Sequence, residues 1–283
     1  MKYFDREIVR PQIGLAYGAG MVEFAEINQN LIDYIELPFE QLRHSPSVGE
    51  IQQNVPIVLH CASLSVAGFV PPDDIVVDSI NHSAIQTRTP WIGEHLAYVS
   101  ADPVSEKLGG RGEPVSLTYT LCPQLSETTL NRVVENLSAL KPYFPVPLIL
   151  ENSPQYFQVP GSTMRMTEFI SEITDRCDVN LLLDLSHFVI TAYNQGLDAF
   201  LELERFPLDR VIEVHISGMS VQSGIAWDDH SMPASSIVFD LLERLLASTR
   251  PRALTFEYNW SPDFPTSLLT SHVKRARDLM GVA

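Results

Sequence analysis

Residues 181–187 read LLLDLSH, an apolar run that ends in an acid, with a histidine three positions further on. Consecutive leucines are typical of a strand in a parallel sheet that is covered on both faces. We therefore expect a strand at residues 181–185, with Asp184 at its carboxyl end and His187 just beyond it. An ionisable group buried at such an end is costly unless it is paired or binds a metal. The stretch predicts a parallel sheet with a polar site at one end.

The same pattern recurs along the chain, where short runs rich in Ile, Val and Leu alternate with longer amphipathic segments. The expected strands are residues 13–17, 34–38, 56–60, 94–99, 147–152, 181–185, 211–217 and 253–258. The expected helical segments are residues 21–32, 38–53, 73–87, 126–143, 163–177, 197–206, 233–249 and 264–280. This alternation predicts a (β/α)8 TIM barrel, as one domain over residues 1–283. A doubly wound open sheet is the alternative, although no GxGxxG follows the first expected strand.

Composition excludes several classes of protein. The chain has 19 basic and 35 acidic residues and a net charge of −16, which disfavours extensive contact with nucleic acid. Its apolar runs fall short of the roughly 18–20 residues that a membrane span needs, and its first residues lack the apolar core of a secretory signal. The cysteines, Cys61, Cys122 and Cys177, are far apart and form no CxxC. We expect a cytoplasmic protein with reduced thiols.

Polar residues fall repeatedly at the ends of the expected strands. In a TIM barrel the carboxyl ends of all strands form one mouth, where active sites are built. Nine potential metal ligands should therefore converge: His60, His95, Glu151, Asp184, His187, His215, Asp228, His230 and Glu257. A lone histidine near a strand end is more often structural, but five of the eight histidines in the chain belong to this set. A shared metal site would compensate the cost of burying all of them.

The size of this set predicts more than one ion. A mononuclear site usually takes three or four protein ligands, and carboxylates can bridge two cations. Two or three ions at roughly 3.5–4 Å from one another are consistent with nine ligands. Imidazole and carboxylate ligands suit zinc, iron or manganese, and the residues alone do not choose among these metals.

Seven segments in order resemble the multinuclear non-haem iron-dependent oxidases, a family that includes the oxidases of methanobactin and 3-thiaglutamate biosynthesis. The segments are VLHCASLSVAG (58–68), GEHLAYV (93–99), LENSPQYF (150–157), LLLDLSHFVITAYNQG (181–196), EVHISGM (213–219), DDH (228–230) and TFEYNW (255–260). The resemblance implies a xylose isomerase-like TIM barrel that holds two or three irons in mixed Fe(II)/Fe(III) states, with O2 bound at the metal as co-substrate. It also implies a ribosomally made precursor peptide as substrate, usually modified at cysteine, and a partner protein that recognises the leader peptide.

The chain departs from the family pattern at four places. It carries His187 where many members have Asn, and Gln195 replaces a histidine in the NQG that follows. The early GLRxxH reads GLAYGAG, and Asn259 stands where an Asp is common. We expect these departures to affect which substrate is used and which product forms, more than they affect the fold.

Other readings of the same nine residues remain open. Endonuclease IV-type trinuclear zinc enzymes share the order of ligands, so metal-assisted hydrolysis of phosphodiesters is the main alternative, although the charge of −16 weighs against DNA. A xylose isomerase-like sugar isomerase and a non-catalytic scaffold with a vestigial site are further alternatives. Substrate contact is expected from Asn152, Ser186 and Asn194, and from Arg111 in the glycine-rich loop 101–116, where a lid or a partner contact could also lie.

Overall fold

The structure is a computed structural model that describes residues 1–7, 10–18, 20–101, 115–259 and 265–282. Eight parallel strands close into a barrel in the order β1-β12-β9-β8-β7-β4-β3-β2, which confirms the predicted TIM barrel. The barrel strands are β1 (Gln12–Ala16), β2 (Tyr34–Pro38), β3 (Ile57–Cys61), β4 (Ile92–His95), β7 (Leu148–Glu151), β8 (Asn180–Asp184), β9 (Val211–Ile216) and β12 (Ala253–Phe256). Each expected strand therefore coincides with a barrel strand within a few residues.

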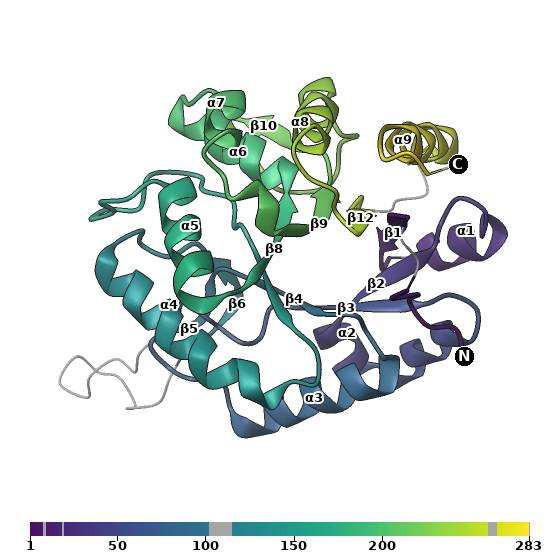
Figure 1. Cartoon of the computed structure of the whole chain (residues 1–283), viewed down its shortest axis with the longest axis horizontal. Coiled ribbons are helices and arrows are strands. Elements are labelled where there is room, and N and C mark those ends of the chain that lie inside the picture. Colours follow the sequence, from purple (N-terminus) through teal and green to yellow (C-terminus); the bar gives the residue numbers. More distant parts are fainter. Residues whose placement is uncertain (8–9, 19, 102–114, 260–264, 283) are drawn as a thin grey trace.

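Helices surround the barrel and cover the outer face of the sheet (Figure 1). They are α1 (Met21–Ile27), α2 (Phe39–His44), α3 (Asp74–Thr87), α4 (Glu127–Leu140), α5 (Met166–Cys177), α6 (Leu185–Gln195), α7 (Ala199–Leu203), α8 (Ser236–Leu246) and α9 (Thr266–Leu279). Short 3-10 helices occur at Pro46–Gln53, Lys141–Tyr143 and Leu208–Arg210. No helix in the described part of the chain is long and apolar enough to cross a membrane.

Burial on both faces explains why the strands read as apolar runs. In β8, Leu181 and Leu183 pack in the larger hydrophobic cluster that includes residues of the helices, whereas Leu182 packs in a second cluster with Tyr34 and Trp91. Successive side chains of a strand point to opposite faces, so the two clusters are the outer layer and the barrel interior. LLL is apolar because neither face of β8 meets water.

The expected strand at 94–99 is divided in the structure. Strand β4 ends at His95, and the backbone N–H of Ala97 turns back to the carbonyl of His95 at 2.8 Å. The following residues form β5 (Tyr98–Ala101), which pairs antiparallel with β6 (Val115–Leu121) outside the barrel. Loop residues 102–114, including Arg111, lie outside the described residues.

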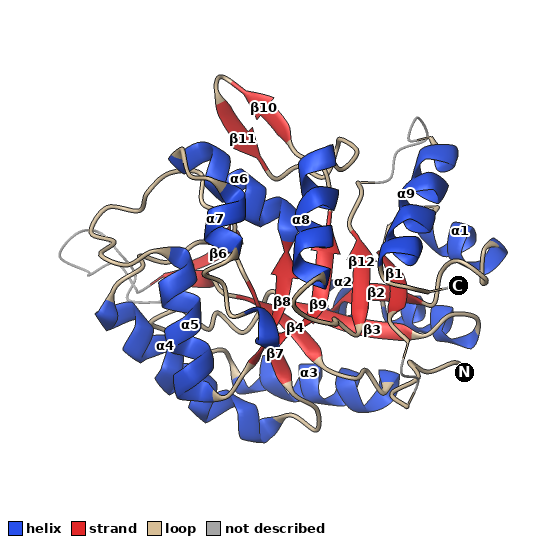
Figure 2. Ribbon diagram, turned by 45° about the horizontal axis from the view of Figure 1, so that its top comes forward, coloured by secondary structure: helices blue, strands red, loops and turns tan. Residues whose placement is uncertain are grey.

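Helix α6 begins directly after β8 without a loop, and the sequence did not predict it. Eight of its eleven residues, Leu185 to Ala192, are buried, so it lacks the polar face that marks an amphipathic helix. The expected helix at 197–206 is reduced to the short α7. A hairpin of β10 (Ser220–Gln222) and β11 (Ile225–Trp227) projects beyond the barrel strands (Figure 2). Its two turn residues, Ser223 and Gly224, have φ of 53° and 80°, as a tight hairpin of this length requires.

Candidate metal centre

The structure brings all nine predicted ligands together at the carboxyl ends of the barrel strands. They form three groups in which one ligand atom from each residue lies within 4.8 Å of the others. The groups are His60, His95 and Glu151; Glu151, Asp184, His215 and Glu257; and His187, Asp228 and His230. Glu151 belongs to two of these groups, and its Oε1 lies 3.1 Å from Nδ1 of His187 in the third, so the three groups are contiguous.

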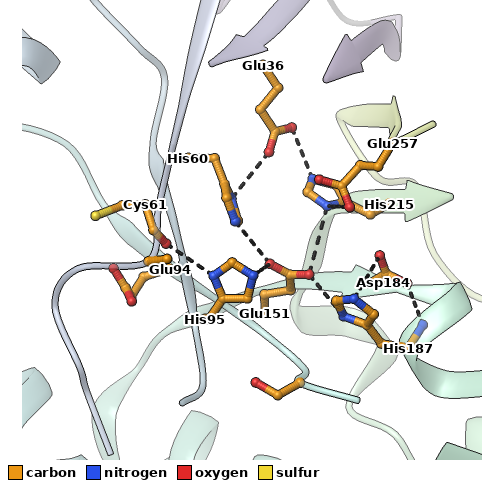
Figure 3. A network of polar contacts seen from close by, with 12 residues as sticks. Glu36, His60, Cys61, Glu94, His95, Glu151, Asp184, His187, His215 and Glu257 are labelled. Atoms are coloured by element: carbon orange, nitrogen blue, oxygen red, sulfur yellow. Dashed lines mark hydrogen bonds and ion pairs between the residues drawn. The ribbon is translucent and has the colours of Figure 1, made fainter. Parts of the chain in front are cut away.

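Glu151 ends strand β7 and lies at the centre of the cluster (Figure 3). Its Oε2 is 3.2 Å from Nε2 of His60 and 3.3 Å from Nε2 of His95. Its Oε1 is 3.1 Å from Nδ1 of His187 and 4.0 Å from Nδ1 of His215. A carboxylate with imidazoles on both sides is suited to bridging two cations.

Asp184 has two roles because it is both the last residue of β8 and the N-cap of α6. Its Oδ1 accepts a hydrogen bond of 2.6 Å from the backbone N–H of His187. Its Oδ2 is buried without a hydrogen bond and belongs to the group with Glu151 and His215. The spacing of three residues between Asp184 and His187 is therefore that of an N-cap and the third helical residue.

Asp228 lies between two histidines in the segment after the β10–β11 hairpin. Its Oδ2 is 2.9 Å from Nε2 of His187, and its Oδ1 is 2.8 Å from Nε2 of His230. His230 has a φ of 53°, a left-handed conformation that is unfavourable for a side-chain-bearing residue. Such strain is common at functional sites and is maintained by the surrounding structure. Here the backbone N–H of Asn259 holds the carbonyl of His230 at 2.9 Å.

Two of the histidines are oriented by backbone carbonyls. Nδ1 of His95 lies 3.4 Å from the carbonyl of Cys61, and Nδ1 of His187 lies 2.9 Å from the carbonyl of Asn152. In each ring the opposite nitrogen, Nε2, then faces a carboxylate of the cluster. Histidines that bind metals almost always donate their second ring N–H to such an oxygen.

Unsatisfied buried atoms indicate that the residues of the cluster fit metal ions. Among the described residues, the buried side-chain atoms without a hydrogen bond are Glu36 Oε1, His60 Nδ1, Glu151 Oε2, Asp184 Oδ2, His215 Nδ1, Ser217 Oγ and Asp228 Oδ1. Glu151 Oε2, Asp184 Oδ2, His215 Nδ1 and Asp228 Oδ1 belong to groups of candidate ligands, whereas Glu36 Oε1 and His60 Nδ1 lie 3.2 Å from each other on the far side of the ring of His60. Burying such atoms without partners costs free energy, and bound cations would provide partners for the carboxylates and imidazoles.

The electrostatics of the cluster follow from burial and from these close contacts. Burial opposes ionisation of Glu151, but the neighbouring His95, His187 and His60 outweigh it and hold the pKa of Glu151 well below its usual value. Burial also disfavours the cationic form of His60, yet Glu151 and Glu36 raise the pKa of His60 to about 10. At Asp184 burial prevails and raises the pKa to about 6. The pKa values of His187, His215 and His230 are raised as well, whereas burial lowers the pKa of His95. Without a metal, protons on the four histidines with raised pKa values balance the carboxylates, so metal binding must displace protons.

Three of the residues expected to contact substrate are held by hydrogen bonds to backbone groups. The side chain of Asn152 pairs with both backbone groups of Asp184, at 3.0 and 2.9 Å. Ser186 pairs in the same way with Ser217, at 2.8 Å for each bond. Asn194 on α6 binds both backbone groups of Ala226 in the β10–β11 hairpin. Their contact with substrate stays a prediction, and Arg111 lies outside the described residues.

Sequence reasoning missed three buried acids on the barrel strands. Glu36 on β2 contacts two histidines of the cluster, whereas Glu94 on β4 and Glu213 on β9 lie beside it. Glu36 is the middle residue of YIELP, so it lies inside its strand and not at the strand end, the position that singled out Glu151 and Glu257. An acid inside an otherwise apolar strand was the signal that could have identified all three.

A cavity of about 240 Å³ opens beside the cluster. His95, His187 and Asp228 form its metal-side wall, strand β6 contributes Leu121, and Cys122 follows directly after that strand. The loop after β7 contributes residues 153–157 and Val159, and the ring of Tyr156 packs against Trp227 at 4.8 Å between centroids. The cavity can accept a mostly uncharged group next to the cluster, because Asp228 is the only Asp, Glu, Lys or Arg among its described lining residues.

The closed barrel and the cluster at its mouth define the class to which the protein belongs: TIM barrels with a candidate metal centre at the carboxyl ends of the strands. The fold is similar to D-psicose 3-epimerase of Clostridium cellulolyticum H10, with a TM-score of 0.58 and 12% identity over 95% of this chain and 98% of that one. It is also similar to endonuclease IV of Thermus thermophilus, with a TM-score of 0.56 and 17% identity over 96% of this chain and all of that one. These similarities show the fold alone.

Residues 12–280 match the family model of the RiPP precursor modification enzymes MbnB/TglH/ChrH, and the chain belongs to this family. This confirms the resemblance to the multinuclear non-haem iron-dependent oxidases. A UPF0276 protein of Vibrio parahaemolyticus is 24% identical over 99% of this chain and 95% of its own length. A UPF0276 protein of Streptomyces avermitilis is 28% identical over 72% of this chain, which matches 41% of the longer relative.

Proposed function

We propose that this protein is an iron- and O2-dependent oxidase that modifies a ribosomally made precursor peptide, with cysteine as the modified residue. The observation that carries the proposal is the position of Glu151, whose two oxygens face four histidines within 3.1–4.0 Å. This arrangement supports two adjacent cations that share one carboxylate. Membership of a family of precursor-modifying enzymes supports a peptide as the substrate.

In this proposal the three groups would hold two or three irons. His60 and His95 would hold one iron, Asp184, His215 and Glu257 would hold a second, and Glu151 would contribute to both positions. His187, Asp228 and His230 serve the third, where His187 supplies the imidazole that many relatives replace with Asn. Iron in mixed Fe(II)/Fe(III) states would supply the redox chemistry by which O2 oxidises the substrate.

The protein's own residues orient the substrate and shield it. The cavity beside the cluster receives the side chain to be modified, with His95 and His187 on its metal side. Apolar and aromatic residues, including Leu121 and Tyr156, line its other wall and exclude water from the reacting group. In the same proposal a separate protein recognises the leader peptide, and the reaction takes place in the cytoplasm.

The test starts with metal analysis of protein purified without oxygen. The proposal expects two to three irons per chain, with O2 consumption and a mass change when a cysteine-bearing precursor peptide is added. Substituting His215→Ala should lower both iron content and O2 consumption, because His215 is fully buried in the cluster. His44→Ala, on the exposed end of α2, is the matched control. Zinc alone, together with nicking of abasic DNA, would overturn the proposal in favour of a phosphodiesterase.

A further inference from the structure

Glu36 on β2 contacts two histidines of the cluster from behind (Figure 3). Its Oε1 lies 3.2 Å from Nδ1 of His60, and its Oε2 lies 3.0 Å from Nε2 of His215. Glu36 is 2% exposed and His215 is fully buried, so water cannot replace either contact. One carboxylate therefore connects a histidine of β3 with a histidine of β9.

Each of these histidines presents its opposite nitrogen to the cluster. Nε2 of His60 faces Glu151, and Nδ1 of His215 lies 3.1 Å from Oε2 of Glu257. The two nitrogens of an imidazole point in divergent directions, so the nitrogen beside Glu36 cannot also bind an ion among Glu151 and Glu257. Glu36 is thus on the side of both rings that faces away from the predicted metal positions.

The group formed by Glu36, His60 and His215 could in principle hold an ion itself, because its ligand atoms lie within 4.8 Å of one another. Two observations oppose this use. Oε2 of Glu36 already accepts a hydrogen bond of 2.6 Å from Oγ1 of Thr255. An ion there would also compete for the two histidines with the ions expected beside Glu151 and Glu257. Nε2 of His215 hydrogen-bonds to Oε2 of Glu36, and Nδ1 of His60 lies 3.2 Å from Oε1 without a hydrogen bond, so each carboxylate oxygen faces one ring nitrogen.

We propose that Glu36 is a positioning residue that binds no metal and accepts the N–H of both His60 and His215. It thereby makes His60 an Nε2 ligand and His215 an Nδ1 ligand of two neighbouring ions. Carboxylates in this position fix the tautomer and orientation of a ligating histidine and raise its basicity. Thr255 fixes the carboxylate in turn, and the hydroxyl of Tyr34 lies 2.7 Å from Oγ1 of Thr255. The inference rests on the proposed function because it requires metals at the cluster.

Substituting Glu36→Gln tests this role with little change of shape. An amide has one acceptor oxygen and one donor NH2, so it can accept an N–H from only one of the two histidines. The other histidine must turn or change its tautomer, which withdraws its ligating nitrogen. The matched control is Glu94→Gln, because Glu94 is equally buried but accepts a hydrogen bond from the backbone N–H of Leu64 rather than from a histidine.

The experiment loads metal-free wild type, Glu36→Gln and Glu94→Gln with Fe2+ under anaerobic conditions. Affinity is measured by competition with a chelator, the iron environment by 57Fe Mössbauer spectroscopy, and folding by circular dichroism. We expect Glu36→Gln to remain folded and to bind iron about 10–100-fold more weakly with an altered spectrum. Glu94→Gln should match the wild type. A folded Glu36→Gln protein with wild-type affinity and spectrum would overturn the inference.

A structure of the iron-loaded wild type gives a second test that does not depend on the variant's folding. The inference expects iron at Nε2 of His60 and Nδ1 of His215, with Glu36 outside the coordination sphere. A Glu36 oxygen at a bonding distance of about 2.0–2.2 Å from an ion would overturn it. Failure of the wild type to take up iron would instead overturn the proposed function, and the role of Glu36 with it.

Discussion

Asp184 caps the helix that carries His187, and the same carboxylate also faces the candidate metal centre. Oδ1 accepts the backbone N–H of His187 at 2.6 Å, whereas Oδ2 is buried without a hydrogen bond beside the cluster. The cap fixes where α6 begins and therefore where the ring of His187 lies. One residue thus couples the end of strand β8, the start of a helix and the position of two candidate ligands.

Substituting Gly93→Ala should displace His60 from the cluster. Gly93 pairs with His60 across β3 and β4, and an added Cβ would lie 2.6 Å from Nδ1 of His60. The same Cβ would approach Leu182 at 3.1 Å, so the ring cannot keep its place. We expect loss of about one iron per chain, measured by metal analysis. Gly49→Ala is the control because its Cβ would meet Leu42 at 3.5 Å, an ordinary contact. Unchanged iron content in Gly93→Ala would contradict this prediction.

Substituting Asn152→Ala should destabilise the fold around Asp184. The amide of Asn152 pairs with both backbone groups of Asp184, and its loss leaves the buried N–H of Asp184 without this partner, whereas the carbonyl, as that of an N-cap residue, still accepts the first hydrogen bond of α6. A buried N–H without a partner costs about 1–3 kcal/mol, so we expect the free energy of unfolding to fall by about 1–3 kcal/mol. Urea denaturation measures the change. The control is Asn54→Ala, which removes only an exposed hydrogen bond from Asn54 to Glu26 and should alter stability little. Equal stability of the two variants would show that the pairing with Asp184 contributes nothing.

The stability of the metal-free protein should depend on pH through Glu213. Burial, with a further contribution from Glu36, raises the pKa of Glu213 from 4.5 to about 8, so the folded protein holds a proton that the unfolded chain releases. This stabilisation is fully present below pH 4.5 and is lost as the pH rises to about 8. The ionisable groups that influence Glu213 or contact it are Glu36, His215 and Tyr34.

The comparison variant for this pH dependence is Glu213→Gln, which cannot titrate. Between pH 5 and 8 the free energy of unfolding of the wild type should fall relative to that of the variant, by up to about 1.4 kcal/mol per pH unit. Denaturation of both proteins across this range, in the presence of a chelator, measures the difference. Parallel pH profiles would rule out a protonated Glu213 in the folded protein.

Filling the cavity beside the cluster should separate substrate binding from metal binding. Leu121 lines the cavity on β6, a strand that contributes none of the nine candidate ligands. Substituting Leu121→Trp should raise the KM for the precursor peptide at least severalfold while iron content stays that of the wild type. Leu121→Ile, which conserves volume, is the control and should leave KM near the wild-type value. A wild-type KM in Leu121→Trp would place the peptide elsewhere.

The sequence by itself determined the eight barrel strands and the nine residues at the mouth. The strands are runs of residues that are apolar on both faces of the sheet, and the length and pattern of such runs can be read from the local sequence. Parallel strands in a closed barrel all end at the same mouth, so strand-end residues such as Glu151 and Asp184 had to meet. The structure brings the nine residues together as expected, and their role as ligands awaits metal analysis.

Only the tertiary structure decided what those residues contact. Helix α6 was hidden because it is buried nearly all round and so shows no polar face, and the split between β4 and β5 depends on antiparallel pairing with β6. Glu36 was missed because it is singled out by its contacts with His60 and His215, and both residues are distant from it in sequence. Which nitrogen of a histidine faces the cluster depends on the acceptor behind the ring, and that acceptor comes from another strand. Local pattern fixes the elements and their ends, whereas the geometry of the cluster arises only when the barrel closes.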